Sequence, residues 1–183
     1  MGLGARQAAM LLDLSRLRAG IERVERKYPP SAFPDKDDFR VVAPVELTAE
    51  VRKDAKNVRL VGRLKTTLEC ECSRCLDPFA VPIDTGLDLL FLPVSTNAGT
   101  GELEVGDEDL GVSFYQEDTI DLGEVMREQF HLGLPMKPLC REDCRGLCPV
   151  CGANWNRETC TCSTAWEDPR LAPLKKLVDR RGD

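Results

Sequence analysis

Six of the nine cysteines in this 183-residue chain lie within 23 residues of one another, and this spacing constrains the fold more than any other feature. They are Cys140, Cys144, Cys148, Cys151, Cys160 and Cys162. Cys148 and Cys151 flank a Pro-Val pair, and Gly152 follows with the freedom to adopt the positive φ of a tight turn. Such a turn lets two thiolates bind one ion at about 2.3 Å, so the spacing predicts a metal site.

The second pair of ligands for this site is predicted to come from Cys160 and Cys162. Residues two apart in an extended segment point to the same side, so both sulfur atoms can reach one tetrahedral ion. Eight residues separate Cys151 from Cys160, which is enough for the chain to reverse. We therefore expect Cys148, Cys151, Cys160 and Cys162 to share an ion.

A second Cys-x-x-Cys, formed by Cys72 and Cys75, has a plausible mate in Cys140 and Cys144. Eight cysteines would then fill two four-thiolate sites, and we expect one or two structural zinc ions. Cys70 is left over, and its neighbours indicate a strand end rather than a ligand. Spacing alone leaves open an exchange of Cys70 for Cys72, or of ligands between the two sites.

Disulfides are the main alternative, and they depend on the compartment. Residues 1–10 contain no apolar run, and Leu11 and Leu12 are followed at once by Asp13, so we expect no secretory signal. No segment approaches the roughly 18 apolar residues that span a bilayer. These features predict a cytoplasmic chain without a membrane partner, in which such spacing favours metal over disulfides. Redox-active and iron–sulfur cysteines stay open, because thiolates alone do not select the metal.

The charge of the chain is distributed unevenly. Residues 76–126 contain no Lys or Arg but twelve carboxylates, whereas residues 1–75 carry 15 basic and 11 acidic side chains. Two zinc ions on eight thiolates would move the formal net charge from −6 to about −10. This predicts an acidic face for a basic partner and argues against phosphate binding by bulk charge. For residues 95–111 we favour a solvated, partly disordered loop.

No catalytic constellation is found in the sequence. The chain has one histidine, His131, and it lacks the phosphate-loop, dinucleotide-binding and nucleophile-elbow motifs. Zinc bound by four thiolates has no open position at which to activate water. We therefore expect a protein that is not an enzyme and has no small-molecule substrate, with His131 at a surface or helix end.

Three segments show the alternation of apolar and polar residues that is typical of strands: 39–52, 57–71 and 79–92. Turn residues at 54–57 separate the first two. The pattern predicts an antiparallel sheet with one solvated face. Cys72 and Cys75 then lie at a hairpin end, where a metal would attach the sheet to the cysteine-rich tail.

Three helices are predicted. In the first, Leu14, Leu17, Ile21, Val24 and Tyr28 have helical spacing, although a strand over 21–28 is the alternative. The second begins with Asp121 as its cap and ends at Gly133 and Pro135. Its buried stripe is expected to be Leu122, Val125, Met126 and Phe130. The third begins near Pro173, and its basic side could contact RNA phosphate or simply be solvated.

Together these patterns predict an α+β fold, with an antiparallel β-rich domain, a C-terminal zinc-stapled cysteine-rich tail and short helices. Residues 1–135 would form the β-rich domain with its acidic loop and one amphipathic helix. Residues 136–183 would form the zinc-binding tail, which ends in a short helix.

Several motifs resemble those of the YceD family, the large ribosomal RNA subunit accumulation proteins. They are Leu-Pro-Met-Lys-Pro-Leu-Cys at 134–140, Gly-Leu-Cys-Pro-Val-Cys-Gly at 146–152, Cys-Thr-Cys at 160–162, Asp-Pro-Arg-Leu at 168–171, and the run from Leu68 to Phe79. The resemblance implies a cytoplasmic, non-enzymatic factor that supports accumulation of large-subunit ribosomal RNA. It carries over the eight paired cysteines as family positions without assigning them to ions. Cys70, Trp155 and Pro173 depart from the pattern.

Two functional hypotheses follow. The first is a ribosome-assembly factor that binds large-subunit precursor rRNA, a basic large-subunit ribosomal protein, or both, and the acidic stretch favours the protein. The second is a thiol-redox or zinc-handling module, which requires an accessible thiolate of low pKa.

Overall fold

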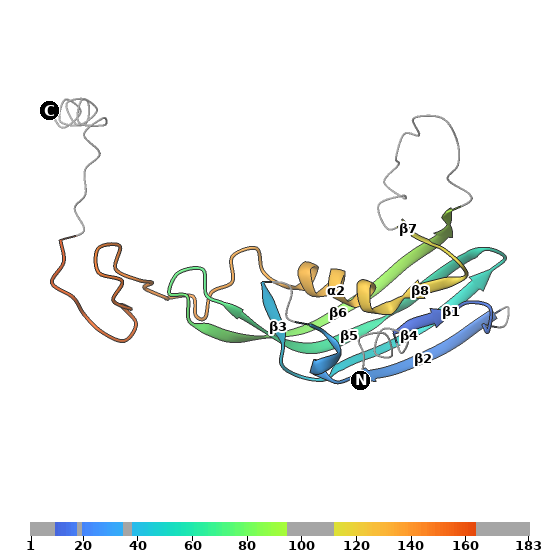
Figure 1. Cartoon of the computed structure of the whole chain (residues 1–183), viewed down its shortest axis with the longest axis horizontal. Coiled ribbons are helices and arrows are strands. Elements are labelled where there is room, and N and C mark those ends of the chain that lie inside the picture. Colours follow the sequence, from blue (N-terminus) through green and yellow to red (C-terminus); the bar gives the residue numbers. More distant parts are fainter. Residues whose placement is uncertain (1–9, 18–19, 35–37, 95–111, 164–183) are drawn as a thin grey trace, which may run out of the picture.

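The computed structural model describes residues 10–17, 20–34, 38–94 and 112–163, and it shows a long curled sheet with a cysteine-rich tail at one end (Figure 1). The strands are β1 (Leu11–Asp13), β2 (Gly20–Tyr28), β3 (Phe39–Val41), β4 (Val45–Asp54), β5 (Asn57–Glu71), β6 (Pro78–Pro93), β7 (Val112–Tyr115) and β8 (Thr119–Asp121). The helices are the 3₁₀ turn η1 (Pro30–Ala32) and the α-helix α2 (Leu122–Gly133). The predicted helix after Pro173 and the predicted loop at 95–111 lie outside these residues.

The main sheet has the strand order β2-β4-β5-β6-β7, with β3 also paired to β5, and β1 pairs separately with β8. All pairs are antiparallel except β6 and β7, which are parallel. The predicted antiparallel β-rich fold is therefore confirmed for most of the sheet and corrected at β7. Parallel neighbours need a connection of a dozen or more residues, and the stretch between Pro93 and Val112 is long enough.

Alternation of apolar residues explains why β4 and β5 form the centre of the sheet. In β4, Val45, Leu47, Ala49 and Val51 are buried and the residues between them are exposed. Their partners across the ladder include Leu64 opposite Leu47, which is also buried. The predicted turn at 54–57 is confirmed, because Asp54 pairs with Asn57 in the ladder.

The predicted strand 39–52 is interrupted, and its two parts, β3 and β4, pair with successive parts of β5. Pro44 lies between them and has no N–H to donate to the ladder. The connection still follows β5, since Val42 N donates to Thr67 O at 3.0 Å and Thr66 Oγ1 donates to Ala43 O at 3.1 Å.

The helix predicted through residues 14–28 is wrong, and the alternative strand is correct. In β2 only Val24 and Tyr28 are buried, and residues four apart share a face in a strand as well as in a helix. Glu22 and Arg26 lie on the same side as Val24 but are exposed, because β2 is at the edge of the sheet. Exposure of these residues at the sheet edge therefore removed the period of two that identifies a strand.

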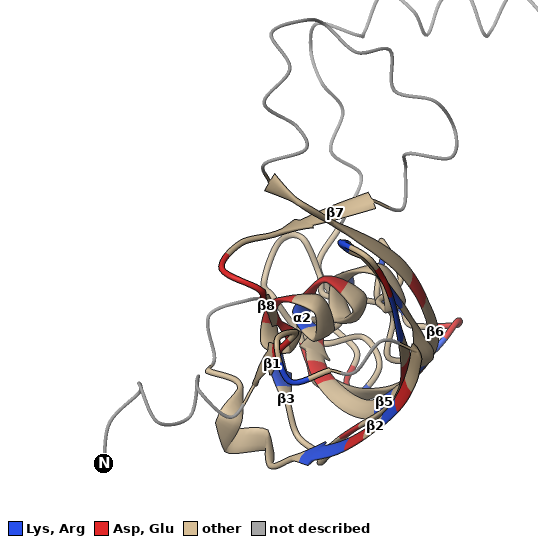
Figure 2. Cartoon of the chain, turned by 90° about the vertical axis from the view of Figure 1, so that its right-hand side faces the viewer, with Lys and Arg blue, Asp and Glu red and all other residues tan. Residues whose placement is uncertain are grey.

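Helix α2 lies in the concavity of the curled sheet (Figure 2). It begins where predicted: Asp121 Oδ1 accepts hydrogen bonds from Gly123 N at 2.8 Å and from Glu124 N at 3.3 Å. The predicted stripe is buried and comprises Leu122, Val125, Met126 and Phe130. The Phe130 ring lies edge-on to Phe39 and fills the space between helix and sheet. The helix ends at Gly133 as predicted.

The convex face of the sheet is charged, and its basic side chains are ion-paired. In Figure 2, blue and red segments interleave along the outer strands. The pairs are Arg23–Glu25, Lys27–Glu46, Arg52–Glu50, Arg59–Asp88, Arg63–Asp84 and Lys65–Asp84. The six basic residues of these pairs are all the Lys and Arg residues on the outward side of β2, β4, β5 and β6. The face is therefore close to neutral.

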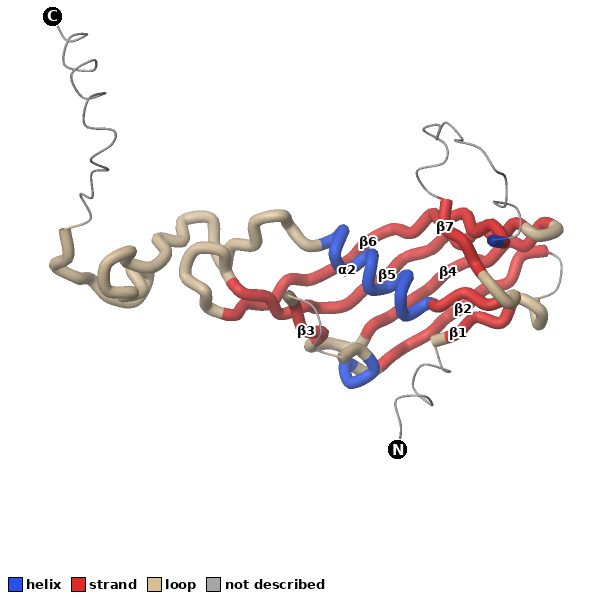
Figure 3. The backbone as a smooth tube through the Cα atoms, turned by 45° about the horizontal axis from the view of Figure 1, so that its top comes forward, coloured by secondary structure: helices blue, strands red, loops and turns tan. Residues whose placement is uncertain are grey.

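Beyond α2, residues 134–163 form loops without a helix or strand (Figure 3). Across the described ranges, no helix combines the length and the apolar composition needed to cross a membrane. The division of the chain after residue 135 stays a prediction.

Candidate metal centres

The eight cysteines expected to bind metal gather in the two groups of four that the spacing favours. In each group all four sulfur atoms lie within 4.8 Å of one another. We call Cys72, Cys75, Cys140 and Cys144 the hairpin centre, and Cys148, Cys151, Cys160 and Cys162 the tail centre. Metal binding by either centre stays a prediction.

The geometry of the hairpin centre fits a tetrahedral ion. The sulfur atoms of Cys72 and Cys144 are 3.7 Å apart, as are those of Cys75 and Cys140. Four sulfurs at about 2.3 Å from one zinc ion would be about 3.8 Å apart, whereas disulfide sulfurs are about 2.05 Å apart. The four side chains therefore match the donor set and the size of a four-thiolate site.

The turn between β5 and β6 places the first two ligands, as predicted for a hairpin end. Cys72 N donates to Asp77 O at 3.0 Å, and Leu76 N donates to Cys72 O at 2.9 Å. Leu76 has φ of 60° in order to close the turn, which is an uncommon conformation for a branched residue. The turn thus directs two thiols toward the tail.

Two contacts hold the tail against this turn. Ser73 N donates to Pro138 O at 2.8 Å, and Arg74 Nη1 donates to Cys144 O at 2.8 Å. Gly146 has φ of 76°, and a Cβ there would lie 3.0 Å from Arg74 O. A side chain at position 146 would therefore strain the backbone and crowd Arg74.

The tail centre is built on a turn of its own. Cys148 N donates to Ala153 O at 2.8 Å, and Gly152 N donates to Cys148 O at 2.9 Å. Gly152 has φ of 76°, which confirms the predicted conformation. Trp155 Nε1 donates to Cys160 Sγ at 3.3 Å, so the residue that departs from the family pattern contacts a sulfur atom.

The two centres differ in exposure. In the hairpin centre Cys72, Cys75 and Cys144 are buried, and Cys140 is the most accessible. In the tail centre only Cys148 is buried. A metal at the hairpin centre would therefore be shielded by the β5–β6 turn, whereas the tail centre is open to solvent.

The pKa is lowered for two thiols of the hairpin centre, Cys72 and Cys144, and for Cys148 of the tail centre. Burial opposes ionisation of Cys72, but backbone N–H groups around its sulfur lower its pKa to about 6. The N–H groups of Cys151 and Val150 lower the pKa of Cys148 to about 7, while the Cys151 side chain raises that of Cys162 to about 12. Ionising one sulfur disfavours charge on its neighbours, and a divalent cation would reverse this and favour all four thiolates.

Four polar residues that sequence reasoning missed join the two centres. Asn156 Nδ2 donates to Cys144 Sγ at 3.3 Å, and Asn156 Oδ1 accepts from Arg145 N at 2.8 Å. Asp77 accepts from Asn154 Nδ2 at 2.8 Å and pairs with Arg157 at 3.0 Å. The available signal was the Asn-Trp-Asn run at 154–156, which follows the Cys-x-x-Cys of Cys148 and Cys151 after two residues. A loop carrying the tail centre therefore supports a ligand of the hairpin centre.

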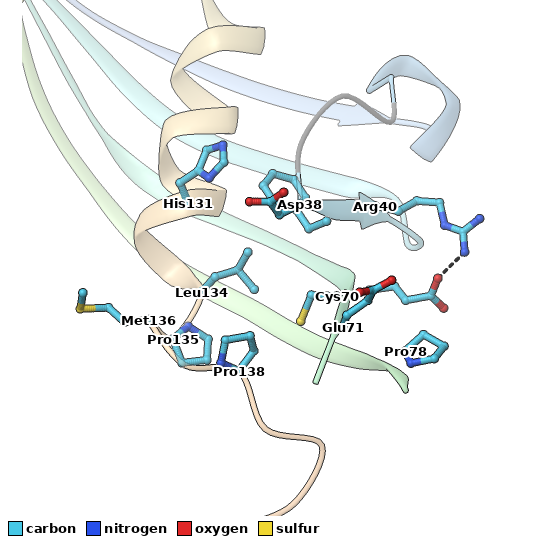
Figure 4. Close-up of a pocket in the computed structure, with 12 residues that line it drawn as sticks. Asp38, Arg40, Cys70, Glu71, Pro78, His131, Leu134, Pro135, Met136 and Pro138 are labelled. Carbon is cyan, nitrogen blue, oxygen red and sulfur yellow. Dashed lines mark hydrogen bonds and ion pairs between the residues drawn. The ribbon is translucent and has the colours of Figure 1, made fainter. Parts of the chain in front are cut away.

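Cys70 belongs to neither centre. It lies near the end of β5, pairs with Phe79 and is 7% exposed, which agrees with the predicted strand end. Its side chain lines a groove of about 870 Å³ between the end of α2, the following segment and the ends of β3, β5 and β6 (Figure 4). Met136 is fully exposed at its margin. His131 also lines the groove and is exposed at the helix end, as predicted.

Comparison with known proteins gives a consistent set of relatives. The sequence model of the family described as "Large ribosomal RNA subunit accumulation protein YceD" matches residues 60–178. An uncharacterized protein of Mycobacterium tuberculosis is 34% identical over 141 residues, which cover 76% of this chain and 64% of that protein. The chloroplastic large ribosomal RNA subunit accumulation protein YCED homolog 1 of Zea mays is 29% identical over 159 residues, covering 72% of this chain and 53% of that protein.

The uncharacterized protein YlbN of Bacillus subtilis is 28% identical over 142 residues, which cover 77% of this chain and 78% of that protein. The chain thus spans less than two thirds of the length of the mycobacterial and maize relatives. No solved structure matches the chain significantly.

Proposed function

Because this chain belongs to the YceD family, we propose that it is a non-enzymatic ribosome-biogenesis factor that supports accumulation of large-subunit ribosomal RNA. The match over residues 60–178 is the observation that carries the proposal, because it spans all eight paired cysteines. The maize relative is named for the same role. A cytoplasmic location and structural zinc are part of this proposal.

The direct partner in this proposal is a basic ribosomal protein rather than bare RNA. RNA binding by charge requires Lys and Arg that are free to neutralise phosphates. On the convex face these side chains are ion-paired with carboxylates, for example Arg59 with Asp88. Binding phosphate there would break such pairs, so the face supports at most weak contact with RNA.

The groove beside the hairpin centre supports a basic partner. Asp38 and Glu71 line its rim, while Glu69 is already paired with Arg40. Apolar surface lies next to these carboxylates, because Leu134 and the fully exposed Met136 line the same groove. An apolar side chain flanked by Lys or Arg would be complementary to this surface.

The metals would be structural in this proposal. Four sulfurs around one ion close the coordination shell, so no position is open for substrate or water. At the hairpin centre, the ion would hold the segment 134–140 beside the groove. Ser73, in the turn that carries Cys72 and Cys75, already donates a backbone hydrogen bond to Pro138 of that segment. The zinc ions would therefore shape the partner surface without acting on the partner.

Gradient sedimentation of the tagged full chain from growing cells, with and without RNase, tests the function. We expect co-migration with large-subunit precursors, and one basic protein that stays bound after RNase. Recovery only at the top of the gradient, free of RNA and protein, would contradict the function and favour the zinc-handling or redox alternative.

A charge-reversed variant tests the groove separately. Asp38→Lys/Glu71→Lys should lose the RNase-resistant protein, whereas Asp54→Lys/Glu128→Lys, with the same charge change on exposed residues elsewhere, should retain it. Retention by both variants would rule out the groove as the contact and leave the assembly role standing.

A further inference from the structure

Strand β2 has an edge without a partner strand. It is bonded along all nine residues, Gly20–Tyr28, to β4, and no other strand in the described part of the chain pairs with it. Nearby β1 pairs with β8 instead. The strand lies at the margin of the sheet in Figure 3. A free edge presents a row of backbone N–H and C=O groups that can pair with another strand.

The charges along this edge are arranged symmetrically about Val24. Its sequence is Gly-Ile-Glu-Arg-Val-Glu-Arg-Lys-Tyr, and its charged residues are all exposed. Counting outward from Val24, Arg23 is mirrored by Glu25, and Glu22 is mirrored by Arg26. An antiparallel copy of the strand, centred on the same residue, would therefore place the four charges nearest Val24 opposite their complements. Lys27, which is already paired with Glu46 of β4, would lie opposite Ile21.

We propose that two copies of this protein form a two-fold symmetric dimer by antiparallel pairing of their β2 edges, with Val24 opposite Val24. Each dimer would contain two Glu22–Arg26 pairs and two Arg23–Glu25 pairs between the copies. Opposite charges directly across a ladder stabilise strand pairing, and like charges destabilise it. The proposal concerns assembly of the chain and does not depend on the proposed function.

No other substantial register satisfies the charges. A two-fold axis perpendicular to the sheet keeps the concave faces of both copies on one side. Residues opposite each other then point to the same face and are an even number of positions apart, so the axis must pass through a residue pair such as Val24 and its copy. Centres at Glu22, Arg23, Glu25 or Arg26 would each place a charged residue opposite itself. Val24 is also the midpoint of β2, so this register alone pairs all nine residues.

The monomer leaves these groups available. The side chains of Glu22 and Arg26 make no hydrogen bond or ion pair with another described residue, and both residues are exposed. Arg23 Nε is 2.9 Å from Glu25 Oε1 of the same strand, with side chains 69% and 64% exposed. Pro29 and Pro30, which lack the N–H needed in a ladder, lie just beyond the paired residues.

Charge-swap variants of the full chain test this interface by sedimentation equilibrium. Wild type should dimerise, and Arg26→Glu or Glu22→Arg should each raise the dimer Kd by at least about tenfold, because each places like charges across the axis twice. An equimolar mixture of the two variants should dimerise like wild type, since every pair is again complementary. Lys56→Glu, an equal charge change at an exposed turn, should leave Kd unchanged.

A wild-type chain that stays monomeric at its highest soluble concentration would overturn the proposal. So would an Arg26→Glu variant that dimerises as tightly as wild type, or a mixture that fails to recover dimerisation. Circular dichroism verifies folding. If a single variant does not fold, the double variant Glu22→Arg/Arg26→Glu is used instead. It carries both changes in the same chain, so two copies of it again form complementary pairs and must dimerise like wild type.

Discussion

The hairpin centre and the tail centre have the same four sulfur donors, but they connect very different lengths of chain. The hairpin centre joins residues 65 and 72 positions apart and buries three of its cysteines. The tail centre gathers cysteines from within 15 residues and buries one. An ion in the hairpin centre would therefore attach the tail to the sheet, whereas one in the tail centre would organise only its own loop.

The largest effect is expected from breaking the hairpin centre. Cys72→Ser should remove one metal ion and release the tail from the sheet, because structural zinc contributes on the order of 10 kcal/mol of coupled folding energy. Native mass spectrometry should count one ion fewer, and proteolysis should cut within 134–147. Unchanged metal content and protease resistance would show that Cys72 is not a ligand.

A smaller effect is expected from Cys148→Ser. This change should also remove one ion, but unfolding should be limited to the loop 146–162 and the sheet should persist. The hairpin centre should keep its ion with weaker affinity, because Asn156 lies in that loop. Hydrogen exchange should rise there and stay unchanged in β4 and β5. If exchange rises throughout the sheet, the effect of the tail centre is not confined to its own loop, and the proposed difference between the two centres is wrong.

Asn156→Ala tests whether the two centres are coupled. The variant loses the hydrogen bond to Cys144 Sγ and the bonds to Arg145 and Arg141. Loss of such a supporting contact typically weakens metal affinity by about 10–100-fold. Chelator competition should show weaker binding at the hairpin centre although the change lies in the tail loop. Equal affinity in the variant would mean that the centres are independent.

Cys70→Ser should leave metal content unchanged, because Cys70 belongs to neither centre. A buried hydroxyl without a partner still costs stability, on the order of 1–2 kcal/mol. Cys70→Ala is the matched control and should be closer to wild type in urea unfolding. Loss of an ion in either variant would show that Cys70 exchanges with Cys72.

The smallest effect concerns the sheet alone. The hydrogen bond from Arg59 holds the pKa of Asp88 below its usual value of 3.8. A depressed carboxyl pKa stabilises the fold fully above the unfolded pKa, and this contribution is lost as the pH falls through the lower pKa of the folded state. Asp88→Asn should therefore lower the urea midpoint slightly at pH 7, and by a smaller amount as the pH falls below 3.8. A constant difference across this range would rule out the ion pair as its cause.

Local patterns predicted much of this molecule. Alternation located β4, β5 and β6, Asp121 marked the start of α2, and the two Cys-x-x-Cys turns indicated which cysteines would meet. These features depend on residues near one another in sequence, or on ligand spacing that chemistry restricts. The spacing does not select zinc over iron, because both metals bind to four thiolates.

The features that the sequence did not predict share a different physical origin. At β2, edge exposure of Glu22 and Arg26 removed the alternation that marks a strand. The parallel pairing of β7 with β6 depends on the path of the chain rather than on the residues of β7. The bond between Asn154 and Asp77 spans 77 positions, and no local pattern encodes it. Tertiary contacts decided each of these features.

The long separation within the hairpin centre also has a consequence for synthesis. Cys75 is made 65 residues before Cys140, which corresponds to roughly 3–13 s at about 5–20 residues per second. During that interval β5 and β6 can pair while two thiols wait at their tip, with the thiol of Cys70 two positions away. The nascent chain thus passes through a period in which oxidation or a misplaced ion competes with the correct site, and the arrival of Cys140 and Cys144 ends it.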